Sequence, residues 1–302
     1  MDEEYIKKII ALKGAKGKKW LENLPQIIKS YEEKWELKVL SPLHLSYNYV
    51  APADLLDGKH AILKISFPDN HEFITELEAL KFYAAKGSIK IERADIKNGV
   101  MLLEKAVPGL RLREIIEERK QISYASQVLK DLHRPIHSDY PYKFPTIAAW
   151  TKVFARHKKA YSGKSNPVPS WMFKKAEEIF NQYLGEKTEQ VLLHGDLHSD
   201  NILSSERGWL SIDPKGIIGE REFELGAYLR NPYCDFPKGS NYKKLETDRI
   251  LHFSEELGFD KERLQNWAFA CAVISLLWFL EDEKYFNEIY VQNAELLNEI
   301  KL

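Results

Sequence analysis

The sequence predicts an α+β fold of two unequal lobes, a small N-terminal lobe built on an antiparallel sheet and a larger helical C-terminal lobe. The chain has 302 residues, which exceeds a typical single core and favours two units. Strand-like runs dominate the first third of the chain, and helical periodicity dominates after Pro108-Gly109. We therefore place the two domains at 1–105 and 106–302.

The N-terminal lobe begins with helical spacing and continues with strands. Large apolar side chains recur along one face over residues 1–35. Short runs of β-branched or large apolar residues then alternate with Pro, Asp-Gly and Asn-Gly, which predicts strands and turns. The expected strands are 35–43, 46–53, 60–66, 88–96 and 99–107. One helix, 70–85, interrupts them, and Asn98-Gly99 predicts a tight hairpin turn.

The C-terminal lobe is expected to be mostly helical. Ile122, Ala125, Leu129 and Leu132 form one apolar stripe. Further helices are expected at 146–160, 170–184, 242–257, 261–280 and 283–300. Residues 191–213 differ, because short apolar runs flank polar clusters there. This pattern predicts loops and a small hairpin that turns at 204–208.

Composition argues against several classes of partner. Lys and Arg number 44 against 45 Asp and Glu, so the net charge of -1 suggests neither nucleic acid nor an anionic membrane. Cys234 and Cys271 are too few for a disulfide framework and indicate a reducing cytoplasm. The longest apolar stretch, 267–280, is shorter than the ~18 residues that span a bilayer, so it predicts a core helix. We expect no nucleic-acid, membrane or protein partner.

The densest polar cluster points to phosphoryl transfer. It reads His-Gly-Asp-Leu-His-Ser-Asp-Asn over 194–201, and Asp213 follows a predicted hairpin. Kinases use an Asp to orient the accepting hydroxyl, an Asn five positions later, and a second Asp after a hairpin to hold Mg²⁺. Asp196 is therefore the candidate catalytic residue, and Asn201 and Asp213 are the candidate metal ligands.

Two other interpretations of this cluster compete. Its Asp and Asn side chains could merely cap backbone groups in a polar turn. His194 and His198 have the spacing of zinc ligands on a helix, but Gly195 disfavours a helix and no Glu follows the first His. We expect His194 to stabilise the loop by hydrogen bonding, and His198 is a candidate for binding substrate.

A lysine in the strand-rich lobe is the candidate for binding nucleotide phosphates. Lys64 lies within the apolar run Ala-Ile-Leu-Lys-Ile, where burying it without an anion is costly. On the following helix Glu76 lies beside the predicted apolar face, whereas Glu78 points nearly opposite. Glu76 is therefore the expected partner. The alternative is a lysine that faces solvent from an edge strand.

Acidic residues after the cluster are candidates for binding the acceptor. Glu220 and Glu224 belong to the run Gly-Glu-Arg-Glu-Phe-Glu at 219–224. This run could line an acceptor pocket. It could equally be a solvated loop that enters a helix, where acidic residues favour the helix N-terminus.

Taken together, these motifs resemble the aminoglycoside and hydroxyurea phosphotransferases, specifically the streptomycin 6-kinase-like branch. The matching segments are 17–21, 24–25, 35, 48–53, 63–64, 102–104, 108–109, 132–135, 194–203, 212–216 and 229–232. The last three segments are the specific ones, and the resemblance extends over most of the chain.

The resemblance implies a protein-kinase-like fold and an ATP- and Mg²⁺-dependent kinase with a small hydroxylated acceptor. Adenine would lie between the lobes on backbone groups near Glu104 to Ala106. Asp196 would act as the base, with Asn201 and Asp213 on Mg²⁺. Lys64 with Glu76 would hold the α- and β-phosphates.

The chain departs from this family pattern at two places. No Gly-rich loop is present, and Ser46-Tyr47-Asn48 occupies the expected turn. Residues 220–224 replace an expected Asp-Pro-x-Tyr-Glu, and Arg221 adds a cation that predicts weaker binding of a polycationic antibiotic. A nucleotide-binding pseudokinase and a kinase of a metabolic sugar or amino alcohol are the alternatives.

Overall fold

The computed structural model describes residues 3–67, 71–137, 139–230, 240–283 and 286–302. The chain forms two compact units, residues 1–109 and residues 110–302. The sequence places the division four residues earlier. Residues 106–109 stay with the N-terminal unit, where Gly109 approaches Ala106 so closely that a Cβ at Gly109 would lie 2.9 Å from the Ala106 carbonyl oxygen.

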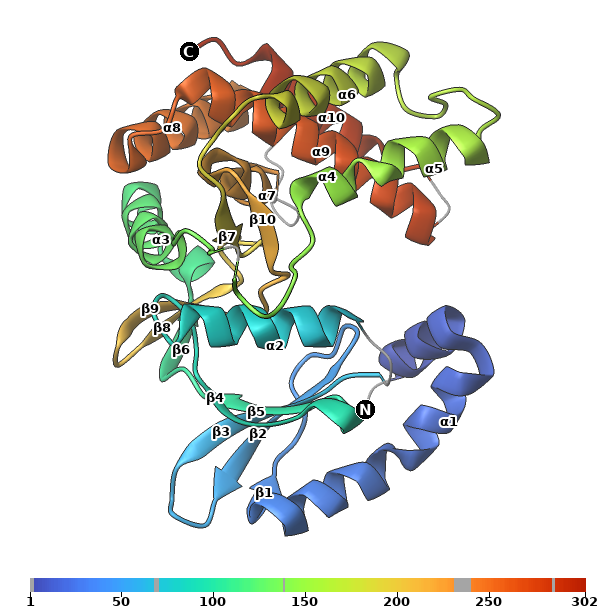
Figure 1. Cartoon of the computed structure of the whole chain (residues 1–302), viewed down its shortest axis with the longest axis vertical. Helices are drawn as coiled ribbons and strands as arrows, with labels where there is room; N and C mark the ends of the chain where they lie inside the picture. Colours follow the sequence, from blue (N-terminus) through green and yellow to red (C-terminus); the bar gives the residue numbers. More distant parts are fainter. Residues whose placement is uncertain (1–2, 68–70, 138, 231–239, 284–285) are drawn as a thin grey trace. The chain divides into compact units, whose positions relative to one another are not determined.

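The N-terminal unit contains a five-stranded antiparallel sheet with the strand order β1-β2-β3-β5-β4 (Figure 1). The strands are β1 (Leu37–Val39), β2 (Tyr49–Leu55), β3 (His60–Ile65), β4 (Ile91–Asp95) and β5 (Val100–Glu104). All five predicted strands and the helix between the third and fourth, α2 (His71–Tyr83), are present. β1 is shorter than predicted because α1 (Glu3–Trp35) continues to Trp35.

Different helices lie on the two faces of this sheet, α1 on one and α2 on the other. α1 changes direction at Gly14, which has φ 57, although Pro25 also lies within the helix. Apolar side chains of α1, such as Leu24, belong to one buried cluster with Leu63 and Ile65 of β3. Because neighbouring strand residues point to opposite faces, Lys64 lies on the other face, the one toward α2.

The connection between β4 and β5 confirms the predicted turn position but not its length. A single turn of 3₁₀ helix, η1 (Ile96–Asn98), precedes Gly99, which adopts φ 66. The Asp95 carboxylate accepts a hydrogen bond from the Asn98 backbone N–H at 3.3 Å. The turn is therefore a capped 3₁₀ turn that ends in a left-handed glycine, a conformation that glycine adopts at little cost.

The C-terminal unit is mainly helical, as predicted. Its helices are η2 (Leu112–Glu114), α3 (Glu118–Leu132), α4 (Ile147–Trp150), α5 (Lys152–Ala160), α6 (Ser170–Gly185), η3 (Arg221–Glu224), α7 (Leu225–Leu229), α8 (Ser240–Leu257), α9 (Lys261–Glu283) and α10 (Glu288–Glu299). α9 packs against α5, α6, α7, α8 and α10. Over Lys261–Asp282 it is long and apolar enough to cross a membrane, but 72% of its most apolar window is buried inside the protein. It therefore packs as a core helix.

Short strands surround the predicted catalytic cluster. β8 (Ile202–Ser205) and β9 (Gly208–Ser211) form the expected hairpin, with Ser205 opposite Gly208. β7 (Val191–Leu193) and β10 (Ile217–Gly219) form a second antiparallel pair that the sequence does not predict. Three-residue strands carry too little periodicity to be recognised. β6 (Pro108–Arg111) spans the boundary between the units, and its Leu110 N–H donates to Ser204 Oγ at 2.9 Å.

A buried charge cluster joins α3 to α8. Arg249 Nη1 lies 2.6 Å from Glu246 Oε1, and Arg249 Nε lies 2.5 Å from Glu118 Oε1. The Glu246 side chain has no exposed surface. Burial raises the pKa of Glu246 to about 7, and the neighbouring Arg249 and Tyr242 oppose the shift only in part.

This raised pKa predicts a pH-dependent stability. The folded chain binds the Glu246 proton more tightly than the unfolded chain, so the stabilisation is complete below about pH 4.5 and is lost as the pH rises through about 7. Relative to Glu246→Gln, the free energy of unfolding of the wild type should therefore fall between these two pH values. Urea denaturation across that range measures the difference. A difference that does not change with pH would contradict the raised pKa.

Candidate active site

The predicted catalytic loop leaves β7 at His194, whose buried side chain is bonded at both ring nitrogens. Nε2 lies 2.8 Å from the Ile212 carbonyl oxygen, and Nδ1 lies 3.3 Å from the Asp196 backbone N–H. This pattern needs a neutral imidazole with the proton on Nε2. Burial likewise lowers the pKa of His194. With both nitrogens occupied, His194 stabilises the loop and is no zinc ligand.

The carboxylate of Glu224 anchors the start of the loop. Glu224 Oε2 accepts a hydrogen bond from the His194 backbone N–H at 2.5 Å, and Oε1 accepts one from Gly195 at 2.8 Å. Glu224 is 1% exposed. Gly195 has φ 83, and a Cβ there would lie 3.0 Å from the Ile217 side chain. Any residue with a side chain would therefore be strained at this position, including the Arg that protein kinases carry before the catalytic Asp.

Asp196 points to Arg230, the residue that follows α7. Arg230 Nη2 donates to Asp196 Oδ1 at 3.1 Å. The Asp196 side chain is 28% exposed and that of Arg230 is 10% exposed. Ser275 Oγ on α9 accepts a hydrogen bond from Arg230 Nη1. Asp196 is thus a partly accessible carboxylate held beside a nearly buried cation.

The charges around Asp196 keep it ionised. Burial opposes ionisation, but Arg230, His198, Lys215 and His194 together outweigh burial and lower the pKa of Asp196. Burial also lowers the pKa of His198, so this imidazole is neutral near pH 7. Because both histidines are neutral near pH 7, Arg230 and Lys215 are the permanent charges that favour the carboxylate.

The two predicted metal ligands follow in the same unit. Asn201 Nδ2 donates to the Asp196 backbone oxygen at 2.9 Å, which leaves the amide oxygen of Asn201 outside this bond. Ile212 N–H donates to the Asn201 carbonyl oxygen at 2.9 Å and so ties the loop to the segment before Asp213. Asp213 is exposed and adopts φ 58, a left-handed conformation that Asp tolerates better than most residues.

The donor set suits a hard cation. Among the described residues, no group of three or more His, Cys, Asp and Glu side chains could hold a metal ion. An amide oxygen and a carboxylate are oxygen ligands of the type that Mg²⁺ takes, and this ion commonly completes its shell with phosphates and water. Asn201 and Asp213 therefore fit Mg²⁺ better than zinc.

His198 and its neighbours tie the far side of the loop to η2. His198 Nδ1 accepts a hydrogen bond from the Asp200 backbone N–H at 3.3 Å. The Asp200 carboxylate accepts two bonds from Arg113 Nη1 at 3.1 and 2.9 Å. Arg113 N–H also donates to the Ser199 carbonyl oxygen at 3.3 Å. The His198 side chain remains 20% exposed beside Asp196, so it stays a candidate for substrate contact.

Glu220 and Glu224, which the sequence offers for acceptor binding, both face the protein interior. Glu220 is 2% exposed and accepts hydrogen bonds from Arg263 Nε at 2.7 Å and from Trp267 Nε1. Glu224 bonds the loop backbone, as described above. These partners favour a positioning role for both carboxylates. Arg221 pairs with Glu189 Oε2 at 2.8 Å, so its charge is balanced, which weakens the predicted repulsion of polycations.

In the N-terminal unit the expected lysine and glutamate form a buried ion pair. Lys64 Nζ lies 2.7 Å from both carboxylate oxygens of Glu76, and the side chains are 5% and 9% exposed. Glu78 on the same helix instead pairs with Lys81 at 2.8 Å nearer the surface. The choice of Glu76 over Glu78 from helix geometry is therefore confirmed as a contact.

Removing the carboxylate of this pair should lower the stability of the protein, because the pair is buried. Glu76→Gln leaves the Lys64 charge buried without its carboxylate, and we expect the free energy of unfolding to fall by about 3 kcal/mol. The double variant Lys64→Met/Glu76→Leu should recover most of that loss, because it removes both buried charges of the pair. Glu78→Gln is the matched control, with an expected loss below about 1 kcal/mol. Equal losses in Glu76→Gln and Glu78→Gln, measured by urea denaturation, would contradict the assignment.

The segment predicted to meet adenine lies at the end of β5. The Glu104 carboxylate accepts a hydrogen bond from the Lys90 backbone N–H at 2.8 Å, and Glu104 N–H donates to the Lys90 carbonyl oxygen at 2.9 Å. Ala106 follows two residues later and is buried. The Glu104 side chain therefore supports the neighbouring backbone.

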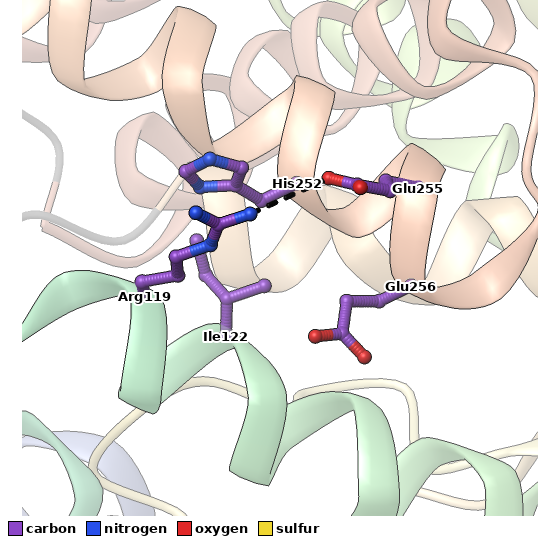
Figure 2. A pocket seen from close by; sticks show the side chains of 5 residues that line it. All are labelled: Arg119, Ile122, His252, Glu255 and Glu256. Carbon is purple, nitrogen blue, oxygen red and sulfur yellow. Dashed lines mark ion pairs between the residues drawn. The ribbon is translucent and has the colours of Figure 1, made fainter.

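A separate hollow lies between α3 and α8. Figure 2 shows Arg119 and Ile122 reaching from α3 toward His252, Glu255 and Glu256 of α8, around a cavity of about 290 Å³. Arg119 Nη2 lies 3.8 Å from Glu255 Oε2. None of the predicted site residues lines this cavity, so it is distinct from the predicted catalytic loop.

Asn231-Pro232, which ends one of the matching motifs, and Cys234 lie outside the described residues. Sequence reasoning assigned no role to Arg230, although it matched the motif that contains it. A lone Arg at the end of a short helix carries no signal of its partner, and Asp196 lies 34 residues away.

Comparison with known proteins identifies the family of the chain. The family model for aminoglycoside/hydroxyurea antibiotic resistance kinases matches residues 42–283. The hydroxyurea phosphotransferase of Kitasatospora aureofaciens is 28% identical over 289 residues, which cover 94% of this chain and 82% of that protein. The streptomycin 6-kinase of Streptomyces griseus is 24% identical over 271 residues, with coverage of 89% and 87%.

A solved structure supports the fold. The amicoumacin kinase in complex with AMP-PNP, Ca²⁺ and Ami has a TM-score of 0.63 at 14% identity, covering 91% of this chain and 92% of that one. The predicted kinase-like α+β fold is thereby confirmed. Because the family model spans most of the sequence, the chain belongs to the aminoglycoside/hydroxyurea antibiotic resistance kinase family and is an ATP-dependent phosphotransferase that acts on small molecules.

Proposed function

We propose that this enzyme transfers the γ-phosphate of Mg-ATP to a hydroxyl group that Asp196 orients. The observation that carries the proposal is the state of Asp196, an ionised carboxylate with 28% of its side chain exposed. It lies on a loop whose backbone is anchored by the buried Glu224. Such a fixed acceptor of a hydrogen bond aligns a hydroxyl for attack and lowers the entropic cost of reaction.

The other site residues have separate roles in this proposal. In the C-terminal unit, Asn201 and Asp213 would hold Mg²⁺. In the N-terminal unit, Lys64, oriented by Glu76, would bind the α- and β-phosphates, and backbone groups from Glu104 to Ala106 would meet adenine. The bound metal ion would screen the negative charge on the phosphates.

The transfer step balances without a further reactant. The acceptor oxygen forms a bond to the γ-phosphorus, and the bond from that phosphorus to the bridging oxygen of ADP breaks. The hydroxyl proton passes to Asp196 and then to solvent. Arg230 stabilises the carboxylate form of Asp196 before the reaction, so Asp196 acts mainly by orienting the hydroxyl.

The acceptor class is proposed from the relatives and from composition. Relatives named hydroxyurea phosphotransferase and streptomycin 6-kinase favour a small hydroxylated antibiotic. The few cysteines favour a cytoplasmic enzyme. A metabolic sugar or amino alcohol is the second candidate, because one fold and one loop serve many acceptors.

Transfer from labelled ATP tests the proposal. The full chain is incubated with Mg-ATP labelled at the γ-phosphate and with a panel that holds hydroxyurea, streptomycin, simple sugars and choline. We expect a labelled product with at least one acceptor, and none when EDTA removes Mg²⁺. Calorimetry measures the binding of Mg-ATP in parallel. Binding without transfer to any compound would favour a pseudokinase, and absence of both would point to a structural role.

A further inference from the structure

The ion pair between Asp196 and Arg230 leaves part of the hydrogen-bonding capacity of each side chain unused. A guanidinium and a carboxylate can form two parallel hydrogen bonds, but here a single bond joins Arg230 Nη2 to Asp196 Oδ1 at 3.1 Å. Within the described part of the chain, Asp196 Oδ2 accepts no hydrogen bond from another side chain, and the other Arg230 bond goes to Ser275. An acceptor oxygen and unused N–H donors therefore belong to the same pair.

The protein holds this guanidinium in place before any substrate binds. Ser275 Oγ accepts from Arg230 Nη1 and itself donates to the Cys271 carbonyl oxygen at 3.0 Å. Asn293 Nδ2 donates to the Arg230 carbonyl oxygen at 3.2 Å. The Trp278 ring lies beside the guanidinium, 5.9 Å from Cζ to the ring centroid. A cation fixed from α9 and α10 pays little entropy to bind a further oxygen.

From this arrangement we infer the chemical class of the acceptor. Its reacting hydroxyl has a second oxygen on the neighbouring atom, either another hydroxyl or a carbonyl. The reacting hydroxyl donates to Asp196, and the neighbouring oxygen accepts from Arg230. A donor and an acceptor on adjacent atoms of the substrate match the acceptor and donor that the ion pair presents. The inference rests on the proposed role of Asp196.

Matched acceptors test this class directly. The first pair is cis-1,2-cyclohexanediol and 1,4-cyclohexanediol, which have the same number of hydroxyls. The second pair is glycolamide and 3-hydroxypropanamide, in which the carbonyl moves one carbon away. A hydrogen bond to a charged group predicts a kcat/KM at least about tenfold higher for the vicinal member of a pair. A preference in one pair alone identifies whether the second oxygen is a hydroxyl or a carbonyl.

Variants test whether Arg230 causes the preference for the vicinal acceptor. Arg230→Met should bring the ratio within each pair close to one. Arg156→Met is the matched control, because Arg156 pairs with Glu281 on another part of α9 and should keep the wild-type ratio. If Arg230→Met fails to bind Mg-ATP or to fold, Ser275→Ala replaces it. That variant removes the hydrogen-bond acceptor of Arg230 Nη1, so the guanidinium is held less firmly. The preference for the vicinal acceptor should then fall several-fold.

The outcomes separate this inference from the proposed function. Transfer at equal rates within both pairs, or a preference that survives in Arg230→Met, overturns the inference and leaves the kinase assignment intact. An equal loss of rate for every acceptor in Arg230→Met, with the ratio unchanged, would show that Arg230 acts through Asp196 alone and would also overturn it. Absence of transfer to any hydroxyl overturns the proposed function and the inference together.

Discussion

Replacing Asp196 with Asn is expected to lower kcat for phosphoryl transfer by about 10²- to 10⁴-fold, the range that a positioned proton acceptor contributes. The amide is similar in shape, but it is neutral, so it accepts a weaker hydrogen bond from the hydroxyl and cannot take the hydroxyl proton. Binding of Mg-ATP should stay close to the wild-type value, because Asp196 is proposed to contact the acceptor. Single-turnover assays with labelled ATP measure the transfer, and calorimetry measures the binding.

The Asp196→Asn substitution also breaks the ion pair with Arg230, so its effect on stability needs a control. Asn at position 196 leaves the Arg230 charge without its carboxylate, so some loss of stability is expected and should be measured by urea denaturation. Asp200→Asn makes the same substitution four residues later, where the carboxylate pairs with Arg113. It should keep kcat within several-fold of the wild type. Equal losses in the two variants, or full turnover in Asp196→Asn, would remove Asp196 from the catalytic role.

Removing the Glu224 carboxylate should damage both stability and turnover. Glu224→Ala leaves two buried backbone N–H groups, of His194 and Gly195, without an acceptor. Each unsatisfied donor costs about 1–3 kcal/mol, so the loss of both should lower the free energy of unfolding by about 2–6 kcal/mol. Because these groups set the position of Asp196, kcat should fall further than KM rises. Glu224→Gln should not restore function, since its NH₂ group would place a donor against a donor.

The neighbouring carboxylate offers a matched comparison. Glu222 lies on the same 3₁₀ turn, and burial raises its pKa, so the neutral Glu222→Gln costs little. We expect this variant to keep wild-type stability and turnover. Glu224→Asp retains the charge and should rescue part of the activity that Glu224→Ala loses. If Glu224→Ala folded and turned over like Glu222→Gln, the loop would not depend on this anchor.

Much of the fold could be predicted because its signals are local. The strands of the N-terminal unit have β-branched runs with turn residues between them, and α9 has a long apolar run. The contact of Lys64 with Glu76 also follows from local rules, since strand alternation and helix spacing select the faces on which they meet. β7 and β10 were missed because their pairing joins residues about 25 positions apart, and neither run is long enough to show a period.

The candidate site likewise has one part that the sequence predicts and another that only the folded chain shows. The sequence by itself determined the residue types and spacing of Asp196, Asn201 and Asp213, because a catalytic loop and the hairpin after it are continuous in the chain. Only the tertiary structure decided that Glu224 turns inward to hold the loop and that Arg230 meets Asp196. In sequence, Glu220, Glu222 and Glu224 are equivalent acids on one short segment. Their different roles arise from which buried donors the folded chain places opposite each carboxylate, and that is a long-range property.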